Sequence, residues 1–181
     1  VARSEHSCET KFGIIEKLAA AIIPITAKIA SAPKSPDCLM SAENEPNITA
    51  SKLIEKIMKL RVGIPIFIEI MTNFMKSENI GERECAFTII SSLITFADVN
   101  ELLDLILTYT LSELGSEAQR VRENAVFVVS DLIQVVCGQS ASTLTAQKEK
   151  IAEFLMSALE PIATIMENDP ISASTASKTL I

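Results

Sequence analysis

Three polar side chains share one face of each of two predicted helices, at a spacing that suits the binding of a cation. They are Glu84, Ser92 and Thr95 in residues 81–97, and Glu123, Asp131 and Gln134 in residues 117–137. In both helices the second residue comes two turns after the first, and the third comes one turn later. Carboxylates beside hydroxyl and amide groups bind Lys and Arg side chains through charge-assisted hydrogen bonds. The pattern predicts an acidic face that binds a basic peptide or a basic protein surface.

Catalytic chemistry has little support. The single histidine, His6, lies in the polar stretch 1–8, which we expect to fray, and no Gly-rich phosphate loop is present. The cysteines contain no CxxC pair, so we expect no metal site. Together these absences lead us to expect no catalytic residue and no cofactor. The cysteines are Cys8, Cys38, Cys85 and Cys137. Cys85 and Cys137 fall among apolar residues, which predicts buried, reduced thiols. The even number also permits disulfides in a secreted protein, although the spacing selects no pairing.

Composition and charge narrow the class of protein. The chain has 181 residues, of which 48% are hydrophobic but only 4% aromatic, with 5 Gly and 7 Pro. Few turn-forming residues and an aliphatic core favour an all-α fold. The net charge of −7 argues against direct nucleic-acid binding, which needs a basic surface. The apolar run Leu18–Ile25 is too short to cross a membrane and no signal peptide is visible, so we expect no membrane insertion.

Residues 83–94 and 122–133 are near copies of each other, 39 positions apart. Six of the twelve positions are identical and three more stay apolar. A period near 40 with helical spacing is typical of stacked helix pairs. The identical positions include an arginine, an alanine and a leucine: Arg83/Arg122, Ala86/Ala125 and Leu93/Leu132.

These repeated residue types have roles that packing explains. An alanine lets two helices approach closely, and the leucine lies two turns further along the same face. An arginine in the first turn of a helix is electrostatically unfavourable, because the helix dipole is positive there. We therefore expect Arg83 and Arg122 to reach a carboxylate or carbonyl group of an adjacent repeat. The alternative is a solvated arginine.

Apolar residues at three- and four-residue spacing predict the helices. The ranges are 10–31 with a kink or restart at Pro24, 50–61, 64–76, 81–97, 99–114, 117–137, and 146–168 with an interruption at Pro161. Asp98 is placed to cap helix 99–114. The proline-rich residues 32–49 predict a mobile loop; residues 138–145 predict a polar loop before the last helix, and 170–181 a final segment.

The first and last of these helices also match each other. Four apolar positions are identical: Ile14/Ile151, Leu18/Leu155, Ala21/Ala158 and Ile25/Ile162. We therefore expect residues 10–31 to be the first helix of a pair, with 50–61 as its partner.

An apolar helix, a short turn, and Arg-x-x-Ala with a leucine seven residues after the alanine together resemble a HEAT repeat. Residues 66–94, IFIEIMTNFMKSENIGERECAFTIISSLI, are similar to helix pairs of importin-β-type nuclear transport receptors. The later stretch SEAQRVRENAVFVVSDLI has the same character. The resemblance covers residues 64–137 best. It implies an all-α fold, a HEAT/ARM-like superhelix of about three to four stacked helix pairs. This α-solenoid region covers residues 1–181, and it is either a whole solenoid or a part of a longer one.

In HEAT solenoids the second helix of each pair usually lines the concave face, so the resemblance places 81–97 and 117–137 there. It implies a protein-binding scaffold in the cytoplasm or nucleus, whose concave face binds basic cargo or the GTPase Ran. Three alternatives stay open. One is a HEAT scaffold of another regulatory complex, and one is a merely solvated helix face. The third is a secreted α-helical carrier of lipid or another hydrophobic ligand.

Overall fold

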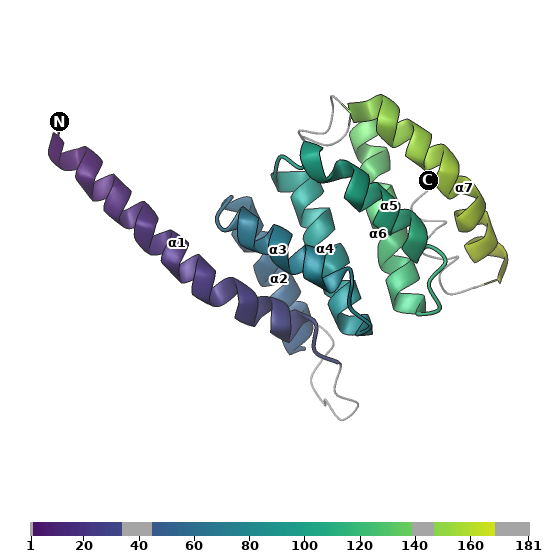
Figure 1. The fold of residues 1–181 in the computed structure, drawn as a ribbon, viewed down its shortest axis with the longest axis horizontal. Coiled ribbons are helices and arrows are strands. Elements are labelled where there is room, and N and C mark those ends of the chain that lie inside the picture. Colours follow the sequence, from purple (N-terminus) through teal and green to yellow (C-terminus); the bar gives the residue numbers. More distant parts are fainter. Residues whose placement is uncertain (1, 34–44, 139–146, 169–181) are drawn as a thin grey trace.

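The chain folds into helices, as its composition and periodicity predict. The computed structural model describes residues 2–33, 45–138 and 147–168 (Figure 1). These ranges hold seven α-helices and no strand. The helices are α1 (Ala2–Ala30), α2 (Pro46–Lys59), α3 (Ile64–Phe74), α4 (Ile80–Phe96), α5 (Leu103–Glu113), α6 (Gln119–Val136) and α7 (Lys148–Asn168).

The start of α5 differs from the prediction. A 3-10 turn, η2 (Asn100–Leu102), replaces the first turn of the predicted helix 99–114. The Asn100 amide donates a hydrogen bond to the Asp98 carboxylate over 3.2 Å. Asp98 therefore binds the first amide of the 3-10 turn and does not cap α5, whose N-cap residue is Leu102.

Two predictions about helix starts are wrong. α1 begins at Ala2, so residues 2–8 are helical rather than frayed. α2 begins at Pro46, inside the predicted loop 32–49. A proline ring already holds the φ angle of a first helical turn, and its missing N–H has no partner to lose there. Residues 34–44, most of the predicted loop 138–145 and the segment 170–181 lie outside the described residues.

Both internal prolines lie within continuous helices, so the predicted interruption at Pro161 is wrong, and of the two alternatives at Pro24, a kink or a restart, the restart is wrong. A proline removes one backbone hydrogen bond and crowds the preceding turn, so packing around it must hold the helix together. Ala158 and Ile162 are buried on either side of Pro161, and Ile23 is buried beside Pro24.

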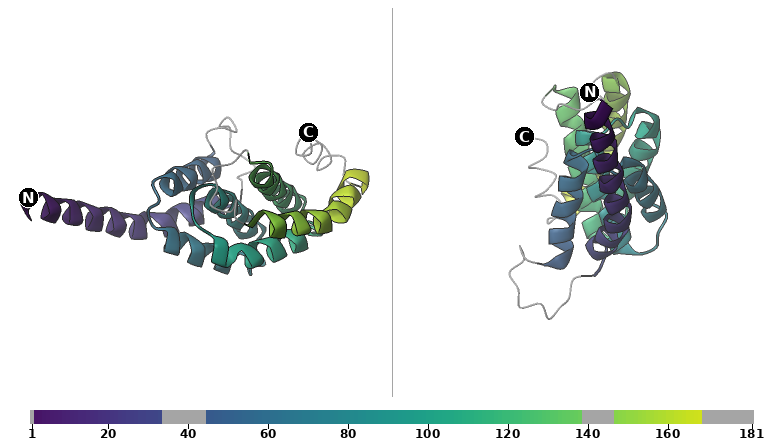
Figure 2. Two further views of the ribbon diagram at one scale, coloured as in Figure 1. Left: turned by 90° about the horizontal axis from the view of Figure 1, so that it is seen from above. Right: turned by 90° about the vertical axis from the view of Figure 1, so that its left-hand side faces the viewer.

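Successive helices pack as neighbours in chain order. α1 packs against α2, α3 against α4, and α5 against α6, while α2, α4 and α6 also pack side by side. α1 further contacts α3, and α5 contacts α7. The helices are thus stacked along the long axis of the molecule, with α1 at one end and α7 at the other (Figures 1 and 2). Because α4 contacts both α2 and α6, it has a helix on each side.

The repeated alanine and leucine residues lie on the buried side of α4 and α6. Ala86 and Ala125 are fully buried, and so are Leu93 and Leu132. Their predicted role in packing is confirmed, since these positions contribute to the core and none of them reaches solvent.

The start of α4 lies against the end of α1. Gly81 is in the first turn of α4, and a Cβ atom added there would collide with the carbonyl oxygen of Ser31. Glycine alone allows this approach of the two backbones. One turn later, the Cys85 thiol donates a hydrogen bond to the carbonyl oxygen of Ala27 over 3.7 Å. The end of α1 is therefore held closely against α4.

α1 departs from the rule that the apolar side of a helix is buried. The apolar residues that define its helical pattern are between 42% and 61% exposed: Ile14, Leu18, Ile22, Ile25 and Ile29. The residues that pack against the rest of the protein lie on the adjacent face: Ala19, Ile23, Thr26 and Ala27. α1 therefore has two apolar faces, and the described residues cover only one of them.

Candidate functional site: a groove over α2, α4 and α6

A groove runs between α2 and α4 and reaches α6. It has a volume of about 410 Å³ and is open to solvent. α2 contributes Ile48, Ser51, Lys52 and Glu55; α4 contributes Thr88, Ser91, Ser92, Thr95 and Phe96; and α6 contributes Asp131. α4 and α6 are the two helices that the HEAT resemblance predicts on the concave face.

Hydroxyl groups of α4 give the groove its hydrogen-bonding capacity. Thr88 Oγ1 donates to the carbonyl oxygen of Glu84 over 3.4 Å, and Thr95 Oγ1 donates to the carbonyl oxygen of Ser91 over 2.9 Å. Each hydroxyl oxygen keeps lone pairs that can accept a hydrogen bond from a bound N–H group. α4 therefore presents a row of acceptors to a ligand in the groove.

Asp131 is the charged group of α6 in this groove. Its side chain is half-buried, and burial raises the pKa of the carboxyl, while a side-chain hydrogen bond from Ser91 acts in the opposite direction. Asp131 forms no ion pair with any described residue. The groove thus holds a partly desolvated carboxylate that forms no ion pair within the described part of the chain, although Lys52 lines the same groove.

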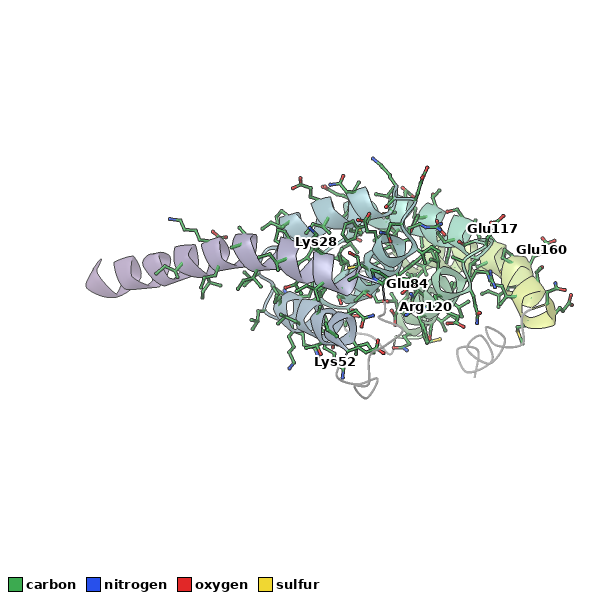
Figure 3. The ribbon with its side chains drawn as sticks, turned by 90° about the horizontal axis from the view of Figure 1, so that it is seen from below. Lys28, Lys52, Glu84, Glu117, Arg120 and Glu160 are labelled. Atoms are coloured by element: carbon green, nitrogen blue, oxygen red, sulfur yellow. The ribbon has the colours of Figure 1, made fainter. Side chains whose placement is uncertain are left out.

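A smaller hollow of about 150 Å³ adjoins the groove and shares lining residues with it. There Glu84 of α4 and Arg120 of α6 form an ion pair, with 3.3 Å between Arg120 Nη2 and Glu84 Oε2. Figure 3 shows these two side chains close together, with Lys52 on α2 to one side. The amide groups of Asn47 and Asn124 complete the polar lining of the hollow.

The structure brings some of the predicted binding residues together. Thr95 and Asp131 line the groove, and Glu84 lies in the adjoining hollow. Ser92 lies in the groove wall but is only 5% exposed, so its prediction as an accessible binding residue is wrong. The reason is that α4 has a helix on each side, which leaves a narrow polar face.

The two remaining predicted residues lie outside the lining of both hollows. Glu123 Oε1 accepts a hydrogen bond from Gln119 Nε2 over 3.0 Å within α6. Gln134 is exposed, one turn beyond Asp131. They flank the groove rather than forming it.

Two cations reduce the acidic character that the sequence predicts for the binding face. Comparison of the two repeated segments does not find them. Lys52 lines the groove, and Arg120 pairs with Glu84. Both cations lie outside the two repeated segments. Arg120 lies eleven residues before Asp131 on α6, which is three helical turns and therefore the same face of the helix. This spacing is the signal by which the sequence could have identified Arg120.

The repeated arginines both find partners. Arg83 Nη1 donates to the Glu113 carboxylate oxygens over 3.1 and 3.3 Å, which confirms the prediction of a carboxylate in the adjacent helix pair. Arg122 Nη1 donates to the carbonyl oxygens of Ser116 and Glu117 over 2.7 and 3.0 Å. Those carbonyl groups belong to the turn before its own helix, not to an adjacent repeat.

The cysteines differ in their surroundings. Cys85 is buried, and burial together with the charge of Glu82 raises the pKa of its thiol to about 12. Cys137 is exposed, which corrects its predicted burial. Among the described residues no cluster of His, Cys, Asp and Glu could hold a metal ion. None of the helices in the described ranges is long and apolar enough to span a bilayer.

Comparison of the chain with protein-family models, with curated protein sequences and with solved structures finds no match. The likeness to HEAT repeats therefore rests on the residues themselves and stays a prediction.

Proposed function

We propose that the chain is a HEAT-type α-solenoid scaffold that binds a basic segment of a partner protein in the groove over α2, α4 and α6. The packing order supports the solenoid. The pairs α1–α2, α3–α4 and α5–α6 follow one another, and their second helices lie side by side. The arginine, alanine and leucine repeated in α4 and α6 support it further. Helix pairs that contact mainly their neighbours form solenoids.

The observation that carries the binding proposal is the environment of Asp131. A half-buried carboxylate without an ion pair is unfavourable, because burial removes water and returns no opposite charge. A Lys or Arg side chain of a partner that enters the groove supplies that charge. Phe127 is exposed one turn before Asp131 on α6, and it offers an apolar anchor beside the carboxylate.

The rest of the groove suits a peptide segment. Ile48 and Phe96 offer apolar contacts, and the hydroxyl groups of α4 accept hydrogen bonds from main-chain N–H groups. By the resemblance to importin-β-type receptors, the proposal extends to nuclear transport. The basic segment then belongs to a cargo, Ran is a second ligand, and the protein acts in the cytoplasm and the nucleus.

The test is a binding titration with a fluorescent Lys/Arg-rich peptide and a counterpart in which Gln replaces the basic residues. We expect only the basic peptide to bind. A hydrogen bond to a charged group contributes about 1.5–3 kcal/mol. Asp131→Asn should therefore weaken binding by roughly 10- to 100-fold.

The matched control is Asp104→Asn on α5, which removes an exposed carboxylate paired with Lys150 over 2.6 Å. It should leave the affinity unchanged. Equal affinities of both variants and the unmodified chain would overturn the proposed site. GTP-loaded Ran is titrated separately, because its failure to bind removes only the transport part of the proposal.

A further inference from the structure

The exposed apolar residues of α1 form a regular line, which we name the α1 strip. It consists of Ile15, Leu18, Ile22, Ile25 and Ile29, each between 42% and 61% exposed. Their spacing alternates between three and four residues, which is the spacing of a helix seam that packs against another helix. Soluble proteins rarely leave so long a line of large aliphatic side chains open to water.

A second line of this kind lies on α7, which we name the α7 strip. It consists of Ala152, Met156, Leu159, Ala163 and Met166, all exposed, with Met156 at 71%. Its spacing alternates between four and three residues, as in the α1 strip. Figures 1 and 2 show α1 and α7 at opposite ends of the molecule, so the two strips can meet only between molecules.

The charges beside the two strips are complementary. Lys17 and Lys28 lie along one edge of the α1 strip, and both are exposed. Glutamates lie along one edge of the α7 strip, and they include Glu149 and Glu160, which are exposed as well. Lys17 and Lys28 are eleven residues apart, as are Glu149 and Glu160, a separation of roughly 16 Å along a helix. Figure 3 shows Lys28 and Glu160 projecting from their helices.

The internal match between α1 and α7 concerns a face of α1 that shares Leu18 and Ile25 with the α1 strip. Three apolar residues of α7 that match exposed residues of α1 are buried where α7 packs on α5 and α6: Ile151, Ala158 and Ile162. The matching face of α1 is therefore built to pack on a preceding helix. In a second copy of this chain, α7 is such a helix, and its exposed strip carries the complementary charges.

We propose that the chain assembles head to tail, with the α1 strip of one molecule packed on the α7 strip of a second copy. α1 of the first molecule then extends the stack of the second copy beyond α7, as α7 extends the stack beyond α5 within one molecule. Such an interface is heterologous, so each assembly keeps one free α1 strip and one free α7 strip unless it closes into a ring.

The experiment measures the mass of the full chain in solution over a range of concentrations and salt. Two double variants each remove one strip: Leu18→Glu with Ile25→Glu on α1, and Met156→Glu with Leu159→Glu on α7. All four positions are exposed, so we expect both variants to keep the circular dichroism of the unmodified chain. Leu105→Glu on α5 is the control, because Leu105 is exposed but lies on neither strip.

The unmodified chain and the Leu105→Glu control should grow in mass with concentration, and less so at high salt. Each strip variant alone should stay at the monomer mass of 19.6 kDa. A mixture of the two should form dimers, since each variant supplies the strip that the other lacks. A monomeric unmodified chain overturns the proposal. So does a mixture that stays monomeric. A strip variant that dimerises alone overturns it as well, because the contact is then between like strips.

Discussion

The Arg83–Glu113 ion pair allows a quantitative test of how α4 is held to the next helix pair. Arg83 Nη1 lies 3.1 Å from Glu113 Oε2, and the two side chains are 22% and 11% exposed. Both fractions are below a third, so solvent screens the pair less than it screens a surface ion pair. The Arg83→Met change keeps most of the aliphatic stem and removes the charge, which leaves the Glu113 carboxylate buried without this partner.

The expected cost lies between two known limits. Exposed ion pairs contribute about 0–1 kcal/mol, while removing one partner of a fully buried pair costs about 3–5 kcal/mol. The burial of this pair places the loss for Arg83→Met at about 2–3 kcal/mol. The Arg83→Met/Glu113→Gln double variant should lose about 1–2 kcal/mol less than the sum of the single variants, because neither charge is then left alone.

Urea unfolding followed by circular dichroism gives the free energies of unfolding for the four members of this cycle. The slope against urea concentration must stay constant across the set for the comparison to hold. Additive losses, with a coupling below about 0.3 kcal/mol, would show that the two groups are independently solvated and would refute the reasoning.

Three further predictions follow from close approach and burial. Gly81→Ala should destabilise the protein by about 1–3 kcal/mol in thermal or urea unfolding, because its Cβ collides with the Ser31 carbonyl oxygen. Asp131→Asn should stabilise the protein at neutral pH, because burial raises the pKa of this carboxyl and so disfavours the charged form. The folded state binds the proton more tightly than the unfolded state. The gain should therefore shrink as the pH falls through the raised pKa, and vanish below the ordinary value of 3.8. Alkylation at pH 8 with peptide mapping should modify Cys137 and spare Cys85 until urea is added, because a buried thiol with a pKa of about 12 forms almost no thiolate.

Each of these predictions has its own control. Gly115→Ala meets only an ordinary contact with the Ser112 carbonyl oxygen, so it should cost less than Gly81→Ala. A stability gain from Asp131→Asn that persists unchanged at low pH would show that ionisation is not its cause. Rapid labelling of Cys85 in the folded protein would contradict its burial beneath α1.

The helices of the middle of the chain were predictable because each has one apolar side and a clear end. α4 and α6 start and end within two residues of their predicted ranges, and the repeated Ala86 and Ala125 are buried as expected. α1 was harder to predict, because apolar residues cover more than one of its faces. Periodicity identifies such a helix but does not tell which face the protein covers.

The candidate site was predictable where it lies on the two helices that contain the repeated segments. Asp131 and Thr95 were found from the α4 and α6 pattern alone. Lys52 was not, because α2 has no copy elsewhere in the chain that marks its groove-facing positions. The burial of Ser92 depends on the presence of a helix on each side of α4, which one helix's sequence does not reveal.

Neighbour-to-neighbour packing also determines the order in which the fold can form during synthesis. α1 and α2 can dock on each other before α3 and α4 leave the ribosome, and α6 then completes its contacts on a surface that α4 already provides. Contacts between segments close in sequence keep the entropy of loop closure low and favour fast folding. Each newly made helix pair can therefore pack against the pair made just before it.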